Sequence, residues 1–263
     1  MQVSVITRSA SKAQNLRDDG VTPILLDLAS SVALQRLPDV DVVLWSVGFD
    51  RASGISRQAI WIDGLQRLLD ALPQRIEPRR ILYTSSTSVY GDMHGQDVDE
   101  NTQPNPTSDG GLACLAAEHL LQNYAQKCSA IVSILRLAGI YGPHRLLRRI
   151  TDLQNGTPIL SPPHEWLNLI HVADAAVAID CISQLESPPS LINIVAKESS
   201  TRRQYYTELA ALADAPPPTF AEPPDLPPQS RGGHRRVISV VRNSLPVAFK
   251  YDTIADGLRN AYS

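Results

Sequence analysis

The sequence predicts an α/β fold in which helices cover both faces of a mostly parallel sheet. Strand-like and helix-like segments alternate through the first half of the chain, and such alternation produces a doubly wound parallel sheet. Residues 40–45 form a continuous apolar run, which is typical of a strand covered on both faces. Small hydroxyl residues at 84–88 follow another apolar run, and sheets of this class bind ligands where their strands end.

In the first half of the chain, the expected strands are runs of β-branched or apolar residues. The expected helices are segments in which apolar residues recur with a period of about 3.6 residues. The expected strands are residues 2–7, 22–26, 40–45, 80–83 and 130–137, and the expected helices are a segment running through Leu16, residues 55–72 and residues 107–127. Ser9 is the expected N-cap of the first helix.

After residue 143 the alternation is less regular. Short strands are expected at 158–160, 167–170 and 191–195, and helices at 172–185, 201–213 and 252–261. Residues 216–228 contain seven prolines, so this stretch cannot be helical. We interpret it as a stiff extended connector rather than as a ligand for a proline-binding module.

The composition is that of an ordinary globular protein, with 263 residues, 43% hydrophobic residues and a formal net charge of −3. This charge gives no field that would attract nucleic acid or an anionic membrane. No apolar run reaches the length of about 20 residues that a membrane span needs. The three cysteines have neither disulfide-framework nor metal-site spacing, so we expect a reduced, cytoplasmic setting and no metal.

Three motifs lie in a diagnostic order along the chain. Residues 83–92 read YTSSTSVYGD, residues 135–143 read LRLAGIYGP, and residues 171–176 read HVADAA. Together they resemble the extended short-chain dehydrogenase/reductase family, which includes NAD-dependent sugar-nucleotide epimerases and dehydratases. The resemblance implies a Rossmann-like sheet with a small C-terminal substrate lobe. It also implies an NAD(P)-binding domain at 1–150 and a region at 151–263 that is mostly substrate lobe, interleaved with the main sheet.

The resemblance assigns a catalytic role to the hydroxyl run. In the family, the third hydroxyl of this run polarises the substrate oxygen, and that position is Ser86. Thr84 and Ser85 are its expected cofactor-side neighbours, and Leu137 and Gly139 are expected to line the nicotinamide end of the cofactor. A hydrogen-bonded strand end without catalytic activity is the alternative.

Other expected cofactor contacts follow earlier strands. Arg8 follows the second strand of the family pattern, where a cation favours NADP over NAD because it meets the 2′-phosphate. Asp27 and Leu28 are expected to flank the adenine, and Ser46 and Val47 stand where the family's backbone passes the cofactor. A solvated arginine and simple turns are the corresponding alternatives.

The sequence lacks the family's opening strand and its glycine-rich turn, GxxGxxG, which receives the pyrophosphate. Val3 to Ser9 instead match the family's second strand. Because the first strand is central in the order 3-2-1-4-5-6, its loss would separate strands two and three from the later strands. We therefore expect either that residues are absent upstream of Met1 or that the domain is shortened and has lost pyrophosphate binding.

The family's Tyr-x-x-x-Lys acid/base pair is also absent. Aligning on Glu118 places Gly110 and Cys114 at the tyrosine and lysine positions. Neither residue can supply the phenol or the ammonium, so the usual hydride-transfer mechanism does not carry over. This pattern resembles an atypical, YeeZ-like branch of the family.

Four other residues are weighed as replacement acids, namely Tyr90, Tyr141, His94 and His144. The resemblance gives the two tyrosines structural roles, and the two histidines lie in loops beside the expected cleft. The cations after the proline-rich stretch are either anion-binding residues or part of a solvated basic loop, and they are Arg231, His234, Arg235 and Arg236.

From the resemblance we expect an NAD(P)-dependent oxidoreductase or epimerase-like protein without the usual acid/base pair. The expected substrate is a small molecule, such as a nucleotide sugar or an aldehyde, and the expected state is a monomer or a homodimer. The alternative is a catalytically silent nucleotide-binding or interaction protein. Turnover that is abolished by Ser86→Ala would favour the enzyme.

Overall fold

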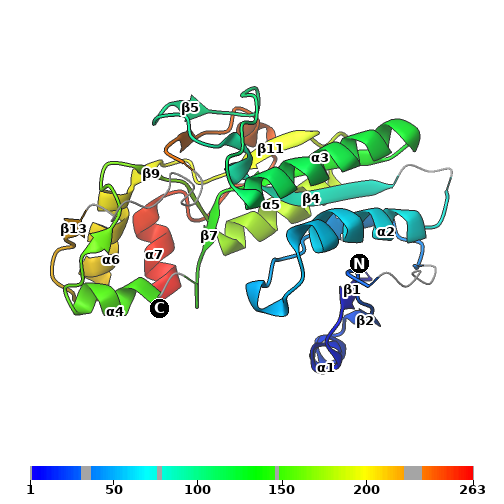
Figure 1. The fold of residues 1–263 in the computed structure, drawn as a ribbon, viewed down its shortest axis with the longest axis horizontal. Helices are drawn as coiled ribbons and strands as arrows, with labels where there is room; N and C mark the ends of the chain where they lie inside the picture. Colours follow the sequence, from blue (N-terminus) through cyan, green and yellow to red (C-terminus); the bar gives the residue numbers. More distant parts are fainter. Residues whose placement is uncertain (1, 31–36, 76–78, 146–147, 222–232, 263) are drawn as a thin grey trace. The chain divides into compact units, whose positions relative to one another are not determined.

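The computed structural model describes residues 2–30, 37–75, 79–145, 148–221 and 233–262 (Figure 1). The chain divides into two compact units. One unit comprises residues 1–39 and 47–74, and the other comprises residues 40–46 and 75–263. The expected boundary between residues 150 and 151 stays a prediction.

The first unit opens with a strand–helix–strand segment. Strand β1 (Ser4–Thr7) pairs in parallel with β2 (Thr22–Leu25), and helix α1 (Ala10–Asp18) connects them. Ser9 is the N-cap of α1, as predicted, because its side chain accepts a hydrogen bond from the backbone N–H of Lys12.

The expected helix at 55–72 is divided. A π-helical segment (Gln58–Asp63) precedes α2 (Gly64–Ala71), and a short 3₁₀ turn (Arg51–Ser53) lies before both. A side chain at position 64 would place its Cβ 3.2 Å from the Leu28 carbonyl oxygen, so glycine allows the helix to pass close to the backbone after β2.

The second unit contains a four-stranded parallel sheet in the order β11-β6-β4-β3. Its strands are β3 (Val42–Trp45), β4 (Arg80–Ser86), β6 (Ile131–Leu137) and β11 (Leu191–Ile194). Among the described residues, β1 pairs with β2 alone. The expected separation of this pair from the later strands stays a prediction.

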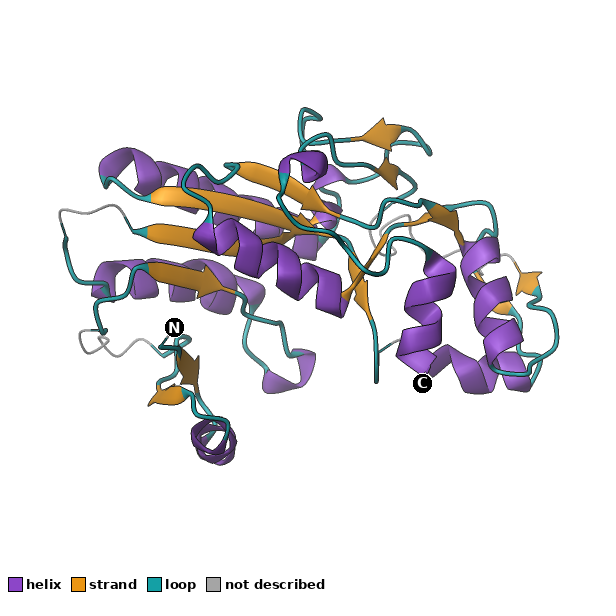
Figure 2. Ribbon diagram, turned by 180° about the vertical axis from the view of Figure 1, so that it is seen from behind, coloured by secondary structure: helices purple, strands orange, loops and turns teal. Residues whose placement is uncertain are grey.

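Two long helices lie on opposite faces of the four-stranded sheet. They are α3 (Asp109–Lys127) and α5 (Val172–Gln184), and Figures 1 and 2 show them from opposite sides. Each begins with a side-chain cap. Ser108 accepts from the backbone N–H of Gly111, and His171 accepts through Nδ1 from that of Ala173. These caps satisfy N–H groups that a helix leaves unpaired at its first turn.

In the C-terminal part of this unit, three helices pack around an apolar cluster. The helices are α4 (Arg148–Gln154), α6 (Arg202–Leu212) and α7 (Ile254–Tyr262). The cluster includes Tyr141, Leu153, Leu209, Ile254 and Leu258. Figure 2 shows these helices grouped beside short strands. The sequence pattern predicted α6 and α7 to within a few residues but did not predict α4.

Short strand pairs complete the unit. They are β5 (Asp97–Val98) with β14 (Arg236–Val237), β7 (Gly139–Tyr141) with β10 (Leu169–His171), β8 (Ile159–Leu160) with β13 (Phe220–Ala221), and β9 (Trp166–Leu167) with β12 (Ser200–Thr201). The single strand expected at 167–170 is thus two strands. Further 3₁₀ turns are η3 (Thr87–Tyr90) and η4 (Arg242–Ser244).

Part of the proline-rich stretch, from residue 222 on, lies outside the described residues. Its described prolines, 216–218, are not helical, as expected. No helix within the described ranges has the length and apolar character needed to cross a bilayer.

Candidate functional site at the end of β4

The hydroxyl residues at the end of β4 point to two different faces of the sheet, because side chains alternate along a strand. The Ser85 hydroxyl is buried and donates to Glu118 Oε1 at 2.6 Å, on the face covered by α3. Thr84 and Ser86 therefore share the other face. The Thr84 hydroxyl donates to the Trp45 carbonyl oxygen at 3.3 Å.

Ser86 is the half-buried residue that caps the turn after β4. Its Oγ accepts a hydrogen bond from the backbone N–H of Ser88 at 3.1 Å. A serine hydroxyl can donate one hydrogen bond while it accepts others. The backbone thus holds Ser86 Oγ in place while its hydrogen remains available to an oxygen acceptor.

Leu137 and Gly139 follow the same sheet edge. Leu137, the last residue of β6, is paired in register with Ser86. Gly139 begins β7 and pairs with Leu169, and a Cβ there would approach the Asn168 carbonyl oxygen to 3.1 Å. The structure therefore brings Leu137 directly beside Ser86, as expected if both face one ligand.

Ser85 belongs to a buried polar cluster rather than to the Ser86 face. Glu118 accepts hydrogen bonds from Arg136 Nε at 3.0 Å and Arg136 Nη2 at 2.7 Å, in addition to the one from Ser85. Burial acts to lower the pKa of Arg136, but the hydrogen bond and charge of Glu118 raise it above its ordinary value. Only the backbone of Ser85 can therefore serve the cofactor role predicted for this residue without disturbing the cluster.

Tyr90 is part of the core and not a surface acid. It is fully buried, it donates to Asn193 Oδ1 at 2.8 Å, and Arg136 Cζ lies 4.8 Å from its ring centroid. Burial raises its pKa, and the charge of Arg136 opposes that shift. Tyr141 is also fully buried, and burial raises its pKa as well. Both tyrosines thus have the packing roles that their motifs suggest.

Gly110 and Cys114, which align with the missing acid/base pair, lie in the first two turns of α3. Gly111, next to Gly110, packs so tightly that a Cβ would lie 2.7 Å from the Ser88 carbonyl oxygen. Cys114 is buried against β4, where burial first and the neighbouring thiol second raise the pKa of Tyr83. The thiol of Cys114 therefore faces a buried phenol of the core.

The predicted adenosine-side residues of the first unit follow two neighbouring parallel strands. Arg8 follows β1 and forms an ion pair with Asp50 at 3.4 Å. Asp27 follows β2, and its carboxylate accepts from the backbone N–H of Ala29 at 2.9 Å. Since parallel strands end at one edge, Arg8 and Asp27 lie at the same edge of the β1–β2 pair.

Three further predicted contacts lie in loop backbone. The Leu28 carbonyl oxygen accepts from Arg67 Nη2 at 2.6 Å, and the Val47 carbonyl oxygen accepts from Trp61 Nε1 at 2.8 Å. Ser46 is the exposed residue that follows β3.

Some of the remaining candidate acids and cations are exposed, and others form hydrogen bonds or ion pairs. His94 and His144 are exposed and adopt positive φ angles of 52° and 62°. Arg235 is buried and donates to the Gly91 carbonyl oxygen at 2.7 Å, and burial lowers its pKa to about 10. Arg236 is paired with Asp97. Arg231 lies outside the described residues.

Sequence reasoning did not predict the partners that organise this region. Glu118 was used only as an alignment landmark, although it is 1% exposed and connects β4, β6 and α3. A carboxylate on the apolar side of a helix was the available signal, because a buried charge requires a partner. For Asp50, the partner of Arg8, the neighbouring sequence contains no comparable signal of an ion pair.

Comparison with known proteins identifies the family. The profile of the "NAD dependent epimerase/dehydratase family" matches residues 1–194. The chain belongs to this family. Protein YeeZ of Escherichia coli K12 is 32% identical over 220 residues, which cover 83% of this chain and 73% of YeeZ.

Solved structures support the same fold for this epimerase/dehydratase family member. A conserved protein of unknown function from Silicibacter pomeroyi DSS has a TM-score of 0.75 at 26% identity, covering 98% of this chain and 88% of the other. UDP-glucuronic acid 4-epimerase from Bacillus cereus, solved with UDP-glucuronic acid and NAD, has a TM-score of 0.79 at 21% identity, covering 99% and 90%.

Proposed function

We propose that this family member binds an NAD-type dinucleotide and acts on an oxygen-bearing small molecule through Ser86. The observation that carries the proposal is the Ser86 hydroxyl, which accepts from the Ser88 N–H and keeps its own hydrogen for an acceptor. A hydrogen bond from Ser86 to a substrate carbonyl or hydroxyl oxygen stabilises negative charge that develops there.

A nicotinamide cofactor, when bound, supplies hydride transfer, and the proposed protein contacts hold its two ends. At the nicotinamide end, Leu137 lies in register with Ser86, and Gly139, two residues further along the chain, is assigned to the same end. The other proposed contacts are Arg8, Asp27, Leu28, Ser46, Val47, Thr84 and the backbone of Ser85. Asp27 uses one oxygen in its turn, and a carboxylate retains other lone pairs for a ribose hydroxyl.

The proposed substrate class is a nucleotide sugar or an aldehyde. The Bacillus cereus epimerase, which shares this fold, was solved with UDP-glucuronic acid. Both substrate types present an oxygen that Ser86 can polarise. We propose a cytoplasmic location and a monomeric or homodimeric state.

A binding protein without turnover is the second candidate function. Cys114, aligned with the family's lysine, is buried against Tyr83 and carries no ammonium group. A cation at that position lowers the pKa of the catalytic phenol in the usual mechanism, and this chain has glycine at the phenol position. Ser86 would then position a bound ligand without a proton donor beside it.

Titration with NADH and NADPH, followed by nicotinamide fluorescence, tests cofactor binding. Turnover is then measured with sugar nucleotides and aldehydes for the wild-type protein, Ser86→Ala and Ser88→Ala. Ser88→Ala is the matched control because Ser88 contributes its backbone N–H, which the variant keeps.

We expect the wild-type protein to bind a cofactor saturably. Ser86→Ala should lose kcat by roughly 10²- to 10³-fold, which is typical for the removal of one such donor, and Ser88→Ala should not. Binding without turnover would favour the second function. Failure to bind either cofactor, or full activity in Ser86→Ala, would contradict the proposal.

A further inference from the structure

Arg57 is an arginine of the first unit whose charge is not paired within the described residues. It is half-buried and directly precedes the π-helical segment. Its guanidinium carbon lies 4.0 Å from the centroid of the Phe49 ring and 5.9 Å from that of Trp61. Its Nε is buried, whereas the two Nη groups, which also lack partners in the described part of the chain, are accessible. The aromatic rings therefore hold the guanidinium and leave its Nη donors unused.

The two rings are themselves fixed at the loop that follows β3. Trp61 Nε1 donates to the Val47 carbonyl oxygen at 2.8 Å. Phe49 packs edge-on against the Trp61 ring, with centroids 5.9 Å apart. Because Val47 is a proposed cofactor contact, the cluster of Phe49, Arg57 and Trp61 holds a cation close to the end of β3, and ligands of this fold class bind where the strands end.

The same loop also reaches the proposed adenosine side of the site. Asp50, next to Phe49, forms an ion pair with Arg8 at 3.4 Å and accepts from the backbone N–H of Ala52 at 2.9 Å. The carboxylate is thus already engaged by two donors. The guanidinium groups of Arg8 and Arg57, taken with this one carboxylate, leave a net positive charge that favours an anionic ligand.

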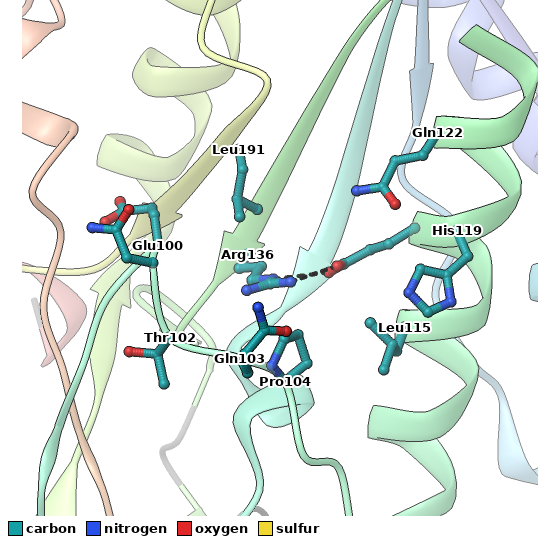
Figure 3. Close-up of a pocket in the computed structure, with 11 residues that line it drawn as sticks. Glu100, Thr102, Gln103, Pro104, Leu115, His119, Gln122, Arg136 and Leu191 are labelled. Carbon is teal, nitrogen blue, oxygen red and sulfur yellow. Dashed lines mark hydrogen bonds and ion pairs between the residues drawn. The ribbon is translucent and has the colours of Figure 1, made fainter. Parts of the chain in front are cut away.

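Arg136 shows the contrasting case of an arginine whose charge is used within the fold. In the cavity drawn in Figure 3, its Nε and Nη2 atoms donate to Glu118. Arg57 has no such carboxylate among the described residues. A guanidinium that stacks on an aromatic ring keeps its N–H groups directed outward in its own plane, and phosphate oxygens match this arrangement of donors.

We infer that Arg57 binds the diphosphate of the dinucleotide. The inference rests on the cofactor binding proposed above and adds the residue that meets the negative charge of the ligand. The diphosphate joins the two nucleosides of the cofactor, and Arg57 belongs to the cluster that connects the Arg8 contact with the Val47 contact. Arg8 serves a 2′-phosphate that only NADP carries, whereas Arg57 serves a group that NAD and NADP share.

A pair of probes that differ in the diphosphate tests this contact. ADP carries the diphosphate, and adenosine lacks it. Calorimetric titration of the full chain should show tighter binding of ADP than of adenosine. Arg57→Gln should weaken ADP binding by roughly tenfold or more, as expected for the loss of charge-assisted hydrogen bonds. The variant should leave adenosine binding unchanged and should weaken NADH and NADPH binding by the same factor.

Two further variants separate this role from general effects of charge and folding. Arg17→Gln removes an exposed cation from the last turn of α1, the end of that helix remote from Arg8, and should not change ADP binding. Arg57→Lys keeps the charge but loses the planar set of donors, so it should recover only part of the ADP affinity. Thermal unfolding of each variant shows whether it is folded, and Arg57→Lys serves as the test if Arg57→Gln is not.

Three outcomes would overturn the inference. They are equal ADP affinity in the wild-type protein and Arg57→Gln, an equal loss in Arg17→Gln, and wild-type binding of ADP that is no tighter than that of adenosine. Binding of ADP that depends on Arg57, in a protein that binds neither NADH nor NADPH, would support the diphosphate contact and contradict the proposed function instead.

Discussion

Glu118 on α3 and Arg136 on β6 form a buried ion pair with an Nη2–Oε2 distance of 2.7 Å, and their side chains are 1% and 4% exposed. The same carboxylate accepts the Ser85 hydroxyl. One glutamate therefore joins the helix to two adjacent strands of the sheet directly behind Ser86.

Replacing Glu118 by glutamine should destabilise the protein strongly. The variant leaves Arg136 charged and buried without its counter-charge, and breaking a buried pair in this way costs about 3–5 kcal/mol. Urea denaturation measures the loss as a lower midpoint. The control is Asp256→Asn, which removes the exposed pair with Arg259 and should cost less than about 1 kcal/mol. Equal midpoints for the two variants would contradict this account.

Removing Asp50 should change cofactor preference. Asp50 caps the turn at 51–53 through Oδ1 and pairs with Arg8 through Oδ2, so its charge is held beside the proposed 2′-phosphate contact. We expect Asp50→Asn to tighten NADPH binding roughly threefold to tenfold and to leave NADH binding unchanged, since removing one nearby charge is worth about 1 kcal/mol in water.

Fluorescence titration of both cofactors checks this expectation. Asp18→Asn is the control, because Asp18 is an exposed acid of α1 whose carboxylate accepts a hydrogen bond from Gln14. A change of the same size for NADH and NADPH would show that Asp50 does not discriminate between them.

His171 should make the protein less stable in mild acid. Burial lowers the pKa of His171, although the charge of Asp174 opposes the shift. The neutral Nδ1 also accepts from the Ala173 N–H, which a protonated ring could not do. Since the unfolded state binds the proton more readily, stability is complete above the unfolded pKa of about 6.5 and is lost as pH falls toward the folded value.

Thermal unfolding at pH 7.5 and pH 5.0 measures this loss. His171→Asn keeps a good N-cap residue without a titrating ring, so its melting temperature should fall less between the two pH values. A steeper fall in the variant than in the wild-type protein would refute the role given to His171.

Most of the fold was predictable because its signals are local. Ser9 caps its helix within a few residues of itself, and the apolar run at β6 marks a strand that is buried on both faces. The same expectation for residues 40–45 was wrong, because Leu44 of β3 is 46% exposed. The division of residues 55–72 into a π-helical segment and α2 was not predictable, because the apolar spacing in that region fits one continuous helix. Helix α4 was missed because its segment is short and polar.

The site was only partly predictable, because a motif gives the order of its residues and not their partners. The hydroxyl run and the two later motifs indicated the family and selected Ser86. They did not show that Ser85 faces Glu118 or that Leu137 lies in register with Ser86.

By itself, the sequence determined the α/β class, the family and the Ser9 cap, because these depend on periodicity and on short motifs. Only the tertiary structure decided which atoms meet across long stretches of chain. Arg8 and Asp50 are 42 residues apart, and Tyr90 and Asn193 are 103 apart. Such pairs form only when packing of the elements brings them within hydrogen-bond range, so no local pattern contains them.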